Sequence, residues 1–319
     1  MNSSEEKEVI QVKNLTKYFK DLKAVDSLSL EIRKGEVFGL LGPNGAGKTT
    51  SINMICGLMK PDEGEVFIKG KKISGAGGKN IRSKVGVCPQ NIIIWPRLTC
   101  YEQLVFMARM YDIPAHIARQ RADSLLTQLE LQEKKDKLAN TLSGGMQRRL
   151  NILLALVHDP ELIIFDEPEA GLDPQSRLLV RDFIIHIARD KTVIFTTHNM
   201  DEADRVSDRV AIIDRGKLLK LDTCENLKKS IGEGDILELT IQSKDETGLL
   251  NAVNRIRQKE IKIIQVEDKL KIKSRNLIEK IPVIYKILED DNIQVNEMNM
   301  RENTLEDVFI YLTGRRLRQ

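Results

Sequence analysis

The sequence predicts an α/β fold in its larger, N-terminal part and a smaller α+β fold in its C-terminal part. Two observations support this prediction. Through about residue 222, short apolar runs alternate with helical patterns, as strands buried on both faces of a largely parallel sheet require. After that point, strands that alternate apolar and polar residues are separated by amphipathic helices. We therefore expect two domains, residues 1–222 and 223–319, in keeping with about 150 residues per domain.

Compact apolar runs place the strands of the first domain. They are residues 38–41, 162–165, 193–196 and 210–213. The first 35 residues differ, because Leu28, Leu30 and Ile32 alternate with polar residues, which indicates a half-exposed antiparallel sheet. Residues 98–157 are mostly helical by pattern, and Pro114 interrupts them. We expect a helical subdomain there.

The second domain reads in the order β-α-β-β-α-β. We expect strands at 237–241, 261–266, 270–273 and 293–300, and helices at 249–256 and 277–288. This order matches a split βαβ, ferredoxin-like unit. Pro282 must lie in the first turn of its helix or kink the helix. A last helix begins at Thr304 with Asp307 and ends at Gly314.

Charge and apolar runs narrow the functional class. The 50 basic and 47 acidic side chains leave a formal charge of +3, which gives no electrostatic case for a nucleic-acid partner. No apolar run approaches the roughly 18 to 20 residues that cross a bilayer. The four cysteines show no CxxC spacing, which favours buried free thiols in a reduced, cytosolic setting.

A glycine-rich loop follows the strand 38–41 and precedes an apolar-periodic helix. Residues 42–49, GPNGAGKT, satisfy the phosphate-loop pattern GxxxxGK[ST] in the context that this pattern requires. The glycines allow backbone N–H groups to point at phosphate oxygens, and the helix start adds its positive dipole end. Lys48 should reach the β- and γ-phosphates, and the Thr49 hydroxyl should bind Mg²⁺. The expected phosphate-binding residues are Gly42, Pro43, Asn44, Gly45, Ala46, Gly47, Lys48, Thr49 and Thr50.

Two acidic residues, Asp166 and Glu167, follow the apolar strand 162–165. Ligands bind at this end of the strands in open parallel sheets. Because adjacent strand residues point to different sides, Asp166 can serve the Mg²⁺ shell while Glu167 faces a water. Such a carboxylate could act as general base, a role worth about 10² to 10⁴ in rate. An acid pair in a plain turn is the alternative, and the phosphate loop disfavours it.

Residues 142–149, LSGGMQRR, resemble the signature of ATP-binding cassette (ABC) ATPases. Ser143 can cap the helix that follows, and Gly144 and Gly145 leave its N–H groups exposed as an anion site. The motif stands between the phosphate loop and Asp166, the order that this family uses. The resemblance implies a P-loop NTPase (RecA-like) core, ATP and Mg²⁺ as its ligands, and ATP hydrolysis as its activity.

The same resemblance implies roles for further residues. Gln90 resembles the glutamine that senses Mg²⁺ and couples to the transport partner, and Phe19, rather than Tyr18, resembles the aromatic residue that stacks on adenine. Asp173 lies in a segment that resembles the D-loop, and His198 resembles the switch histidine that contacts the γ-phosphate. The implied catalytic residues are thus Glu167, His198 and Gln90, and the implied metal ligands are Thr49, Gln90 and Asp166.

Glu169 departs from the family pattern, which commonly has a threonine or serine at this position. It adds negative charge two residues after Glu167. We expect it to raise the proton affinity of the nearby acids and to slow turnover near neutral pH.

The segment 304–316 resembles the end of the drug-resistance and lipid-exporter type cassettes. This resemblance implies an ATPase subunit on the cytoplasmic face of the membrane that powers a separate ABC-2 type permease, with export favoured over import. It also implies a head-to-tail dimer, with itself or with a related cassette. Each ATP would then be held by the phosphate loop of one subunit and by Ser143 and Gly145 of the other.

The alternative functions are soluble ABC ATPases that act on DNA or on the ribosome. The DNA-acting class inserts long coiled coils or extra domains between the phosphate loop and the signature, where this chain has only a short helical subdomain. The ribosome-binding class carries two cassettes in one chain, and this chain has one of each motif.

Residues 92–95 form an apolar cluster after Gln90 that ends in Trp95, the only tryptophan. Core packing is one interpretation. The other is a lining for the groove that receives a helix of the permease. Near-complete burial of Trp95 would favour core packing.

Overall fold

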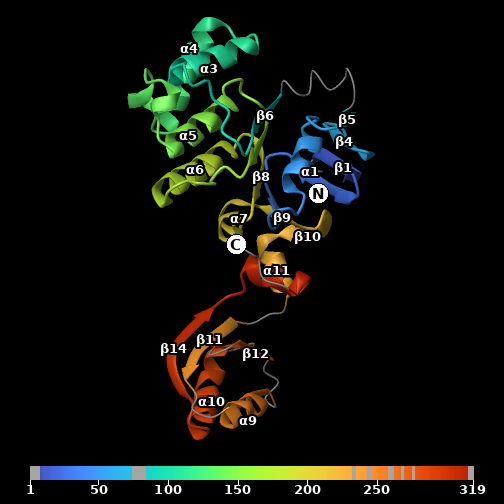
Figure 1. Cartoon of the computed structure of the whole chain (residues 1–319), viewed down its shortest axis with the longest axis vertical. Coiled ribbons are helices and arrows are strands. Elements are labelled where there is room, and N and C mark those ends of the chain that lie inside the picture. Colours follow the sequence, from blue (N-terminus) through green and yellow to red (C-terminus); the bar gives the residue numbers. More distant parts are fainter. Residues whose placement is uncertain are drawn as a thin grey trace, which may run out of the picture. The chain divides into compact units, whose positions relative to one another are not determined.

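A computed structural model describes the chain at residues 8–73, 84–231, 235–242, 246–257, 262–266, 269–274 and 277–314. By its internal contacts the chain divides into two compact units, with the boundary after Cys224. Figure 1 shows the elements of both units in sequence colours. The four cysteines are all free and buried, as the sequence predicted.

A six-stranded sheet forms the centre of the first unit, in the order β10-β9-β3-β8-β7-β6. Its strands are β3 (Val37–Leu41), β6 (Val85–Cys88), β7 (Leu162–Asp166), β8 (Thr192–Thr197), β9 (Arg209–Asp214) and β10 (Lys217–Thr223). All neighbouring pairs are parallel except β9 with β10. Every residue of β3, β7 and β8 is buried, because helices or the second sheet cover both faces of these strands.

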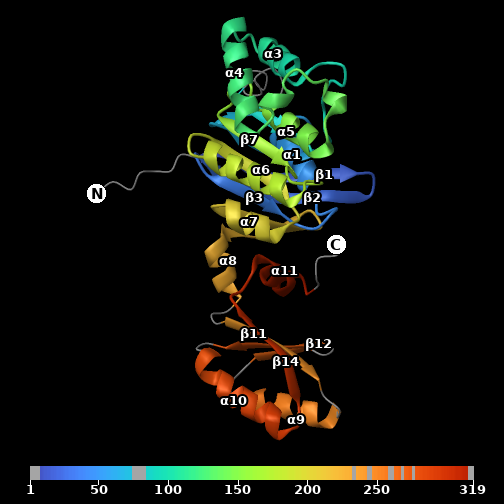
Figure 2. The ribbon, with the colours of Figure 1, turned by 90° about the vertical axis from the view of Figure 1, so that its left-hand side faces the viewer.

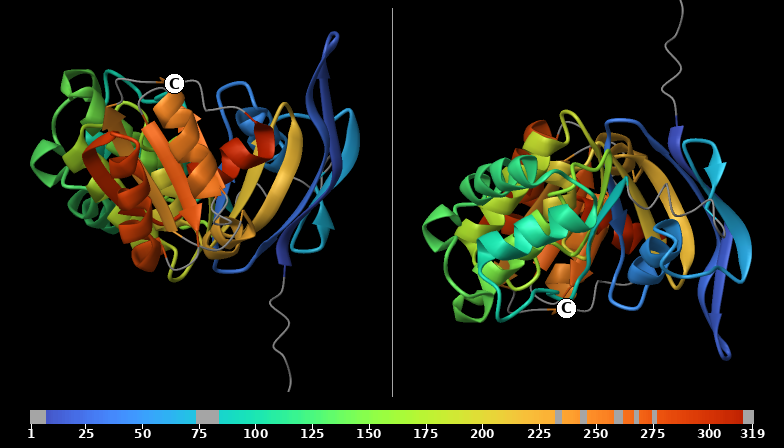
Figure 3. Two further views of the ribbon diagram at one scale, coloured as in Figure 1. Left: turned by 90° about the horizontal axis from the view of Figure 1, so that it is seen from below. Right: turned by 90° about the horizontal axis from the view of Figure 1, so that it is seen from above.

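An antiparallel sheet, in the order β2-β1-β4-β5, forms one side of the first unit (Figure 3). Its strands are β1 (Glu8–Phe19), β2 (Leu22–Arg33), β4 (Glu63–Ile68) and β5 (Lys71–Lys72). Leu28, Leu30 and Ile32 are buried while the residues between them are exposed, so the predicted half-exposed strand is confirmed. One apolar core joins this sheet to the central sheet and to helix α1 (Lys48–Ile55).

The segment in which we expected a helical subdomain holds α3 (Cys100–Met110), α4 (Ala115–Gln128) and α5 (Gly144–Leu154), with 3₁₀ turns η2 (Gln132–Lys134) and η3 (Ala139–Thr141). Helices α3 and α4 lie at the top of Figure 2. Helices α6 (Pro174–Ile187) and α7 (Met200–Val206) follow β7 and β8 and lie outside that segment. Pro114 is the N-cap of α4, so it separates two helices as predicted. Among the residues that the structure describes, no helix has both the length and the apolar character needed to cross a bilayer.

The second unit is an antiparallel sheet in the order β12-β13-β11-β14, with helices α9 and α10 packed on it. Its elements are β11 (Asp235–Gln242), α9 (Glu246–Arg257), β12 (Lys262–Val266), β13 (Lys269–Ser274), α10 (Leu277–Asp290) and β14 (Gln294–Arg301). This is the predicted ferredoxin-like order, so the mixed α/β and α+β fold class is confirmed. Pro282 lies in the second turn of α10, where its missing N–H removes one helical hydrogen bond.

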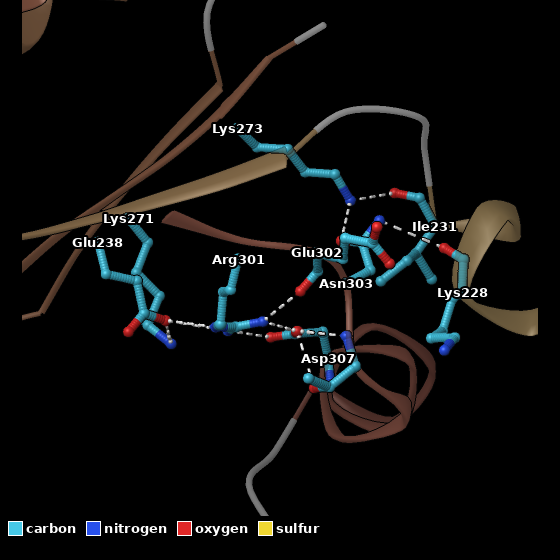
Figure 4. Close-up of polar contacts among 10 residues, drawn as sticks. Lys228, Ile231, Glu238, Lys271, Lys273, Arg301, Glu302, Asn303 and Asp307 are labelled. Atoms are coloured by element: carbon cyan, nitrogen blue, oxygen red, sulfur yellow. Dashed lines mark hydrogen bonds and ion pairs between the residues drawn. The ribbon is translucent and has the colours of Figure 1, made fainter. Parts of the chain in front are cut away.

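Helix α8 (Cys224–Ser230) precedes this sheet and α11 (Leu305–Thr313) follows it. A polar network fixes the start of α11 (Figure 4). Arg301 donates to Glu238 on β11 at 2.9 Å and to Asp307 on α11 at 3.0 Å. Asp307 also forms a capping box with Thr304, and Gly314 ends the helix in the left-handed conformation, as the sequence predicted.

Candidate functional site

The phosphate loop connects β3 to α1 and wraps around its own lysine. Gly47 has φ +99°, and a Cβ atom there would lie 2.5 Å from the carbonyl oxygen of Ala24, so only glycine fits. Lys48 donates to the carbonyl oxygens of Gly42 at 2.7 Å and of Pro43 at 3.1 Å. Burial lowers the pKa of its ammonium, while the carboxylate of Glu167 acts in the opposite direction. A nearly buried cation therefore lies where the loop backbone curves.

A cavity of about 670 Å³ opens beside this loop. Nine of the predicted site residues line it, namely Phe19, Asn44, Gly45, Gly47, Lys48, Thr49, Thr50, Gln90 and Glu167. Tyr18, the second choice for an adenine-stacking ring, does not line it. Leu22, Lys23, Ala24 and Arg215 also line it, and the sequence did not indicate them. Two of these four, Lys23 at the start of β2 and Arg215 in the turn between β9 and β10, are cations near a predicted phosphate site, and no local sequence pattern marks them.

Three side chains from separate elements converge on the carboxylate of Glu167. Oε1 lies 3.6 Å from Nζ of Lys48 and 3.1 Å from Nδ1 of His198. Oε2 accepts a hydrogen bond of 3.2 Å from Nε2 of Gln90. The backbone of Glu167 has φ +49°, a left-handed conformation that costs a non-glycine residue about 1 to 3 kcal/mol. Its N–H donates to the hydroxyl of Thr196 at 3.0 Å, which helps to fix this conformation.

Asp166 is 3% exposed at the end of β7 and accepts a hydrogen bond of 2.5 Å from the Thr196 hydroxyl. It does not line the cavity, whereas Thr49 and Gln90, the other two predicted metal ligands, do. Each of the three side chains has an oxygen atom that could bind a metal ion, and the oxygen atoms of Asp166 belong to a carboxylate. Mg²⁺ is usually bound by one or two carboxylates together with substrate phosphates, so this donor set fits that ion.

The signature residues occupy a separate surface. Ser143 caps α5 by accepting a hydrogen bond of 3.3 Å from the N–H of Met146. Ser143 and Gly144 are exposed, and neither they nor Gly145 line the cavity. A Cβ atom on Gly145 would lie 3.8 Å from a carboxylate oxygen of Asp173. We call Ser143, Gly144, Gly145 and Asp173 the signature surface.

Asp173 has a structural role within this surface. Its carboxylate caps α6 by accepting a hydrogen bond of 2.9 Å from the N–H of Ser176. This bond lowers the pKa of the carboxyl group, so Asp173 is anionic at neutral pH.

Arg148 connects the signature helix to the cavity, and the sequence analysis did not identify it. The side chain is 3% exposed. It donates to the carbonyl oxygens of Pro89 at 3.2 Å, Gln90 at 2.6 Å and Glu167 at 2.8 Å. A guanidinium group can make several such bonds from one plane. Arg148 therefore fixes both the segment that carries Gln90 and the strained backbone of Glu167.

An apolar surface lies beside this helix. Ile92 and Ile93 are 40% and 62% exposed, and Phe106 and Met110 on α3 are 47% and 64% exposed. Trp95 is half-buried, and its ring meets that of Phe106 edge-on at 5.5 Å. The near-complete burial of Trp95 that core packing would favour is not observed. We call these five residues the apolar patch.

Comparison with known proteins adds the family. Residues 25–170 match the family model described as ABC transporter. The linearmycin resistance ATP-binding protein LnrL of Bacillus subtilis is 36% identical over 97% of this chain and 100% of its own length. The daunorubicin resistance ATP-binding protein DrrA3 of Streptomyces coeruleorubidus is 31% identical over 96% of each chain. Both similarities extend through the second unit.

Among solved structures, the chain is similar to the ATP-binding cassette MJ0796, seen as a dimer in a post-hydrolysis state bound to ADP and Pi. The TM-score is 0.63 at 29% identity, over 67% of this chain and 98% of that one. The predicted P-loop NTPase core of the fold class is thereby confirmed.

Proposed function

Because this chain belongs to the ABC transporter family and is an ATPase of that family, we propose that it powers a separate membrane permease in an ABC-2 type export system. The convergence of Lys48, Gln90 and His198 on the carboxylate of Glu167 is the observation that carries the proposal. The two relatives that match the whole chain are named as resistance ATP-binding proteins, which supports export.

The cavity has residues suited to both the adenine ring and the phosphates of ATP. Phe19 is 46% exposed and offers a ring face to adenine, and the backbone of the phosphate loop and Lys48 face the phosphates. Thr49, Gln90 and Asp166 would hold Mg²⁺, which neutralises charge that develops on the phosphates.

Glu167 acts as general base in this proposal. Its carboxylate would accept a proton from the attacking water, a role worth about 10² to 10⁴ in rate. Gln90 and His198 orient that carboxylate, since each contacts one of its oxygens. Nζ of Lys48 lies 3.6 Å from one of these oxygens. Phosphoryl transfer depends mainly on such positioning and charge stabilisation, which these four side chains would supply together with Mg²⁺ and the second subunit.

The signature surface requires a second subunit in this proposal. Ser143 and Gly144 are exposed at the N-terminus of α5 and lie outside the cavity of their own chain. We propose that they complete the phosphate site of a second copy, or of a related cassette, in a head-to-tail dimer. The contact is isologous, so one surface makes both halves of it. The dimeric state of the similar cassette MJ0796 supports this arrangement.

The apolar patch is the proposed contact with the permease, which would keep the chain on the cytoplasmic face of the membrane. Three residues of the patch, Ile92, Ile93 and Trp95, follow Gln90 within five positions of the chain, and Arg148 ties the backbone of Gln90 to that of Glu167. Movement of the segment would therefore be transmitted between the catalytic carboxylate and the partner.

Retention on membranes tests the permease contact. Ile93→Asp and Phe106→Asp place charge on the patch without touching the cavity. We expect both variants to bind and hydrolyse ATP as wild type does, but to lose co-purification with membranes that contain the permease. Ile278, which is 65% exposed in the second unit, provides the matched control Ile278→Asp. Full retention of both patch variants would contradict the proposed contact.

A further inference from the structure

Glu169 forms a contact that the family pattern does not account for. It lies two residues after Glu167, and its Oε1 accepts a hydrogen bond of 2.5 Å from the hydroxyl of Thr197. Thr197 is the last residue of β8 and immediately precedes His198. The side chain of Glu169 therefore joins the segment after β7 to the loop that carries the switch histidine.

A second hydrogen bond extends this contact past the histidine. The hydroxyl of Thr197 accepts from the N–H of Asn199 at 2.9 Å. Asn199 in turn caps α7, because its side chain accepts from the N–H groups of Asp201 and Glu202. Hydrogen bonds thus fix the residues on both sides of His198.

Charged groups from several elements face Glu169. Burial raises the pKa of its carboxyl group, and the hydrogen bond from Thr197 opposes this. Glu202 of α7 and the nearby Glu167 raise the pKa further, and Arg177 of α6 lowers it. Glu202 is itself paired with Arg181 at 3.5 Å. A threonine hydroxyl donates readily to a carboxylate. The Thr197 hydroxyl therefore points its proton at Glu169, and its oxygen remains free to accept from the N–H of Asn199.

We propose that Glu169 is a positioning residue for ATP hydrolysis, which holds the loop of His198 in place beside Glu167 through Thr197 and Asn199. The proposal rests on the proposed roles of His198 and Glu167. Glu169 itself does not line the cavity. Its effect reaches the reaction only through the 3.1 Å contact between His198 and Glu167.

Substitution of Glu169 separates this role from an effect of its charge on the neighbouring acids. The amide oxygen of Glu169→Gln can still accept from Thr197, so positioning predicts a kcat within about twofold of wild type. If the charge of Glu169 slowed turnover by acting on neighbouring acids, the same variant would be faster than wild type near neutral pH.

Loss of the hydrogen bond should lower kcat. For Glu169→Ala and for Thr197→Val we expect kcat to fall about five- to tenfold with KM for ATP nearly unchanged, which is the size of effect that the loss of one ordinary hydrogen bond produces. The double variant should have the same kcat as Thr197→Val alone, because Thr197→Val already removes the hydrogen bond to Glu169 together with the bond from Asn199.

Hydrogen exchange at the backbone amide of Asn199 tests the positioning role without a measurement of ATP hydrolysis. In the nucleotide-free protein we expect exchange about tenfold faster in Glu169→Ala and Thr197→Val, and unchanged in Glu169→Gln. The control Glu36→Gln alters another buried acid, which pairs with Arg209 outside the cavity, and should leave both readouts unchanged. Wild-type kcat and exchange in Glu169→Ala would overturn the proposal.

The variant His198→Ala distinguishes a failure of the proposed function from a failure of the positioning role of Glu169. If it loses hydrolysis while Glu169→Ala keeps it, the proposed function stands and the positioning role fails alone. If His198→Ala keeps the wild-type kcat, the role of His198 fails and the positioning role fails with it.

Discussion

Nδ1 of His198 lies 3.1 Å from a carboxylate oxygen of Glu167. The same oxygen is 3.6 Å from the ammonium of Lys48, and the other oxygen accepts a hydrogen bond from Gln90 at 3.2 Å. Both oxygens therefore have partners before any ligand enters. Preorganised groups of this kind need little rearrangement during the reaction. Changes at Glu167 should accordingly affect hydrolysis more than nucleotide binding.

Glu167→Gln should separate binding from hydrolysis. The amide has nearly the same shape as the carboxylate but cannot accept the proton of the attacking water. We expect ATP hydrolysis to fall about 10²-fold or more, while ATP affinity stays near wild type. In the proposed head-to-tail arrangement ATP favours the dimer and hydrolysis removes that preference, so we expect the variant to elute as a dimer in gel filtration with Mg-ATP.

Ser143→Arg in the Glu167→Gln background provides the control for this dimer. Ser143 is exposed at the start of α5 and lies outside its own cavity, so a large side chain there should block the second subunit and leave ATP binding intact. A monomer from Glu167→Gln alone, or a dimer from the double variant, would argue against the head-to-tail arrangement.

Lys48→Ala should remove most nucleotide affinity. The ammonium is 6% exposed and lies at the base of the phosphate loop, where no other lysine of the cavity lining replaces it directly. Hydrogen bonds to charged groups contribute about 1.5 to 3 kcal/mol each, so calorimetry should show ATP binding weakened at least tenfold. The surface variant Lys69→Ala should bind as wild type does. Equal affinity of the two variants would refute the assignment of Lys48.

Arg148→Lys should lower kcat about tenfold with little change in ATP affinity. Lysine keeps the charge but cannot make three hydrogen bonds from one rigid plane, so at least one of the carbonyls of Pro89, Gln90 and Glu167 loses its partner. A buried carbonyl without a partner costs about 1 to 3 kcal/mol, and we expect this cost to displace Gln90 and Glu167. Steady-state kinetics and ATP titration separate the two effects.

Arg149 gives a matched control, because it is the next residue and is also buried, at 8% exposure. Its guanidinium donates to the carbonyl oxygen of Leu129 at 2.9 Å, within the helical subdomain and away from Glu167. Arg149→Lys should lower stability more than kcat. If the two variants reduced kcat equally, Arg148 would have no special link to the carboxylate.

The sequence predicted those parts of the structure that depend on local patterns. Four apolar runs became buried strands, and the patterns from residue 237 onward predicted the order of strands and helices along the second unit. The glycine-rich loop between a strand and a helix fixed the position of the cavity. Each of these features depends on residues that are close together in the chain, so the spacing of residue types along the sequence is enough to predict it.

Arg148 and Glu169 could not be predicted in the same way. The partners of Arg148 are backbone carbonyls on segments far away in the chain, and a carbonyl has no signature in a sequence. One weak signal existed, since Arg148 and Arg149 lie within α5 directly before residues 150–154, which are apolar except for Asn151. The sequence marked Glu169 as unusual, but only the folded chain places it beside Thr197.

The burial of His158 leads us to expect that the first unit becomes less stable in acid. Its ring stacks on Tyr111 at 3.9 Å, and burial lowers its pKa to about 4, from 6.5 for the free side chain. Because the unfolded chain binds this proton more readily, stability is fully present above pH 6.5 and is lost as the pH falls toward 4. For a half-buried ring we expect a loss of about 1 to 2 kcal/mol. Denaturant unfolding across this range should show the loss in wild type and a flatter profile in His158→Phe, which keeps the stack but does not titrate. Parallel profiles would show that the folded protein does not hold His158 neutral.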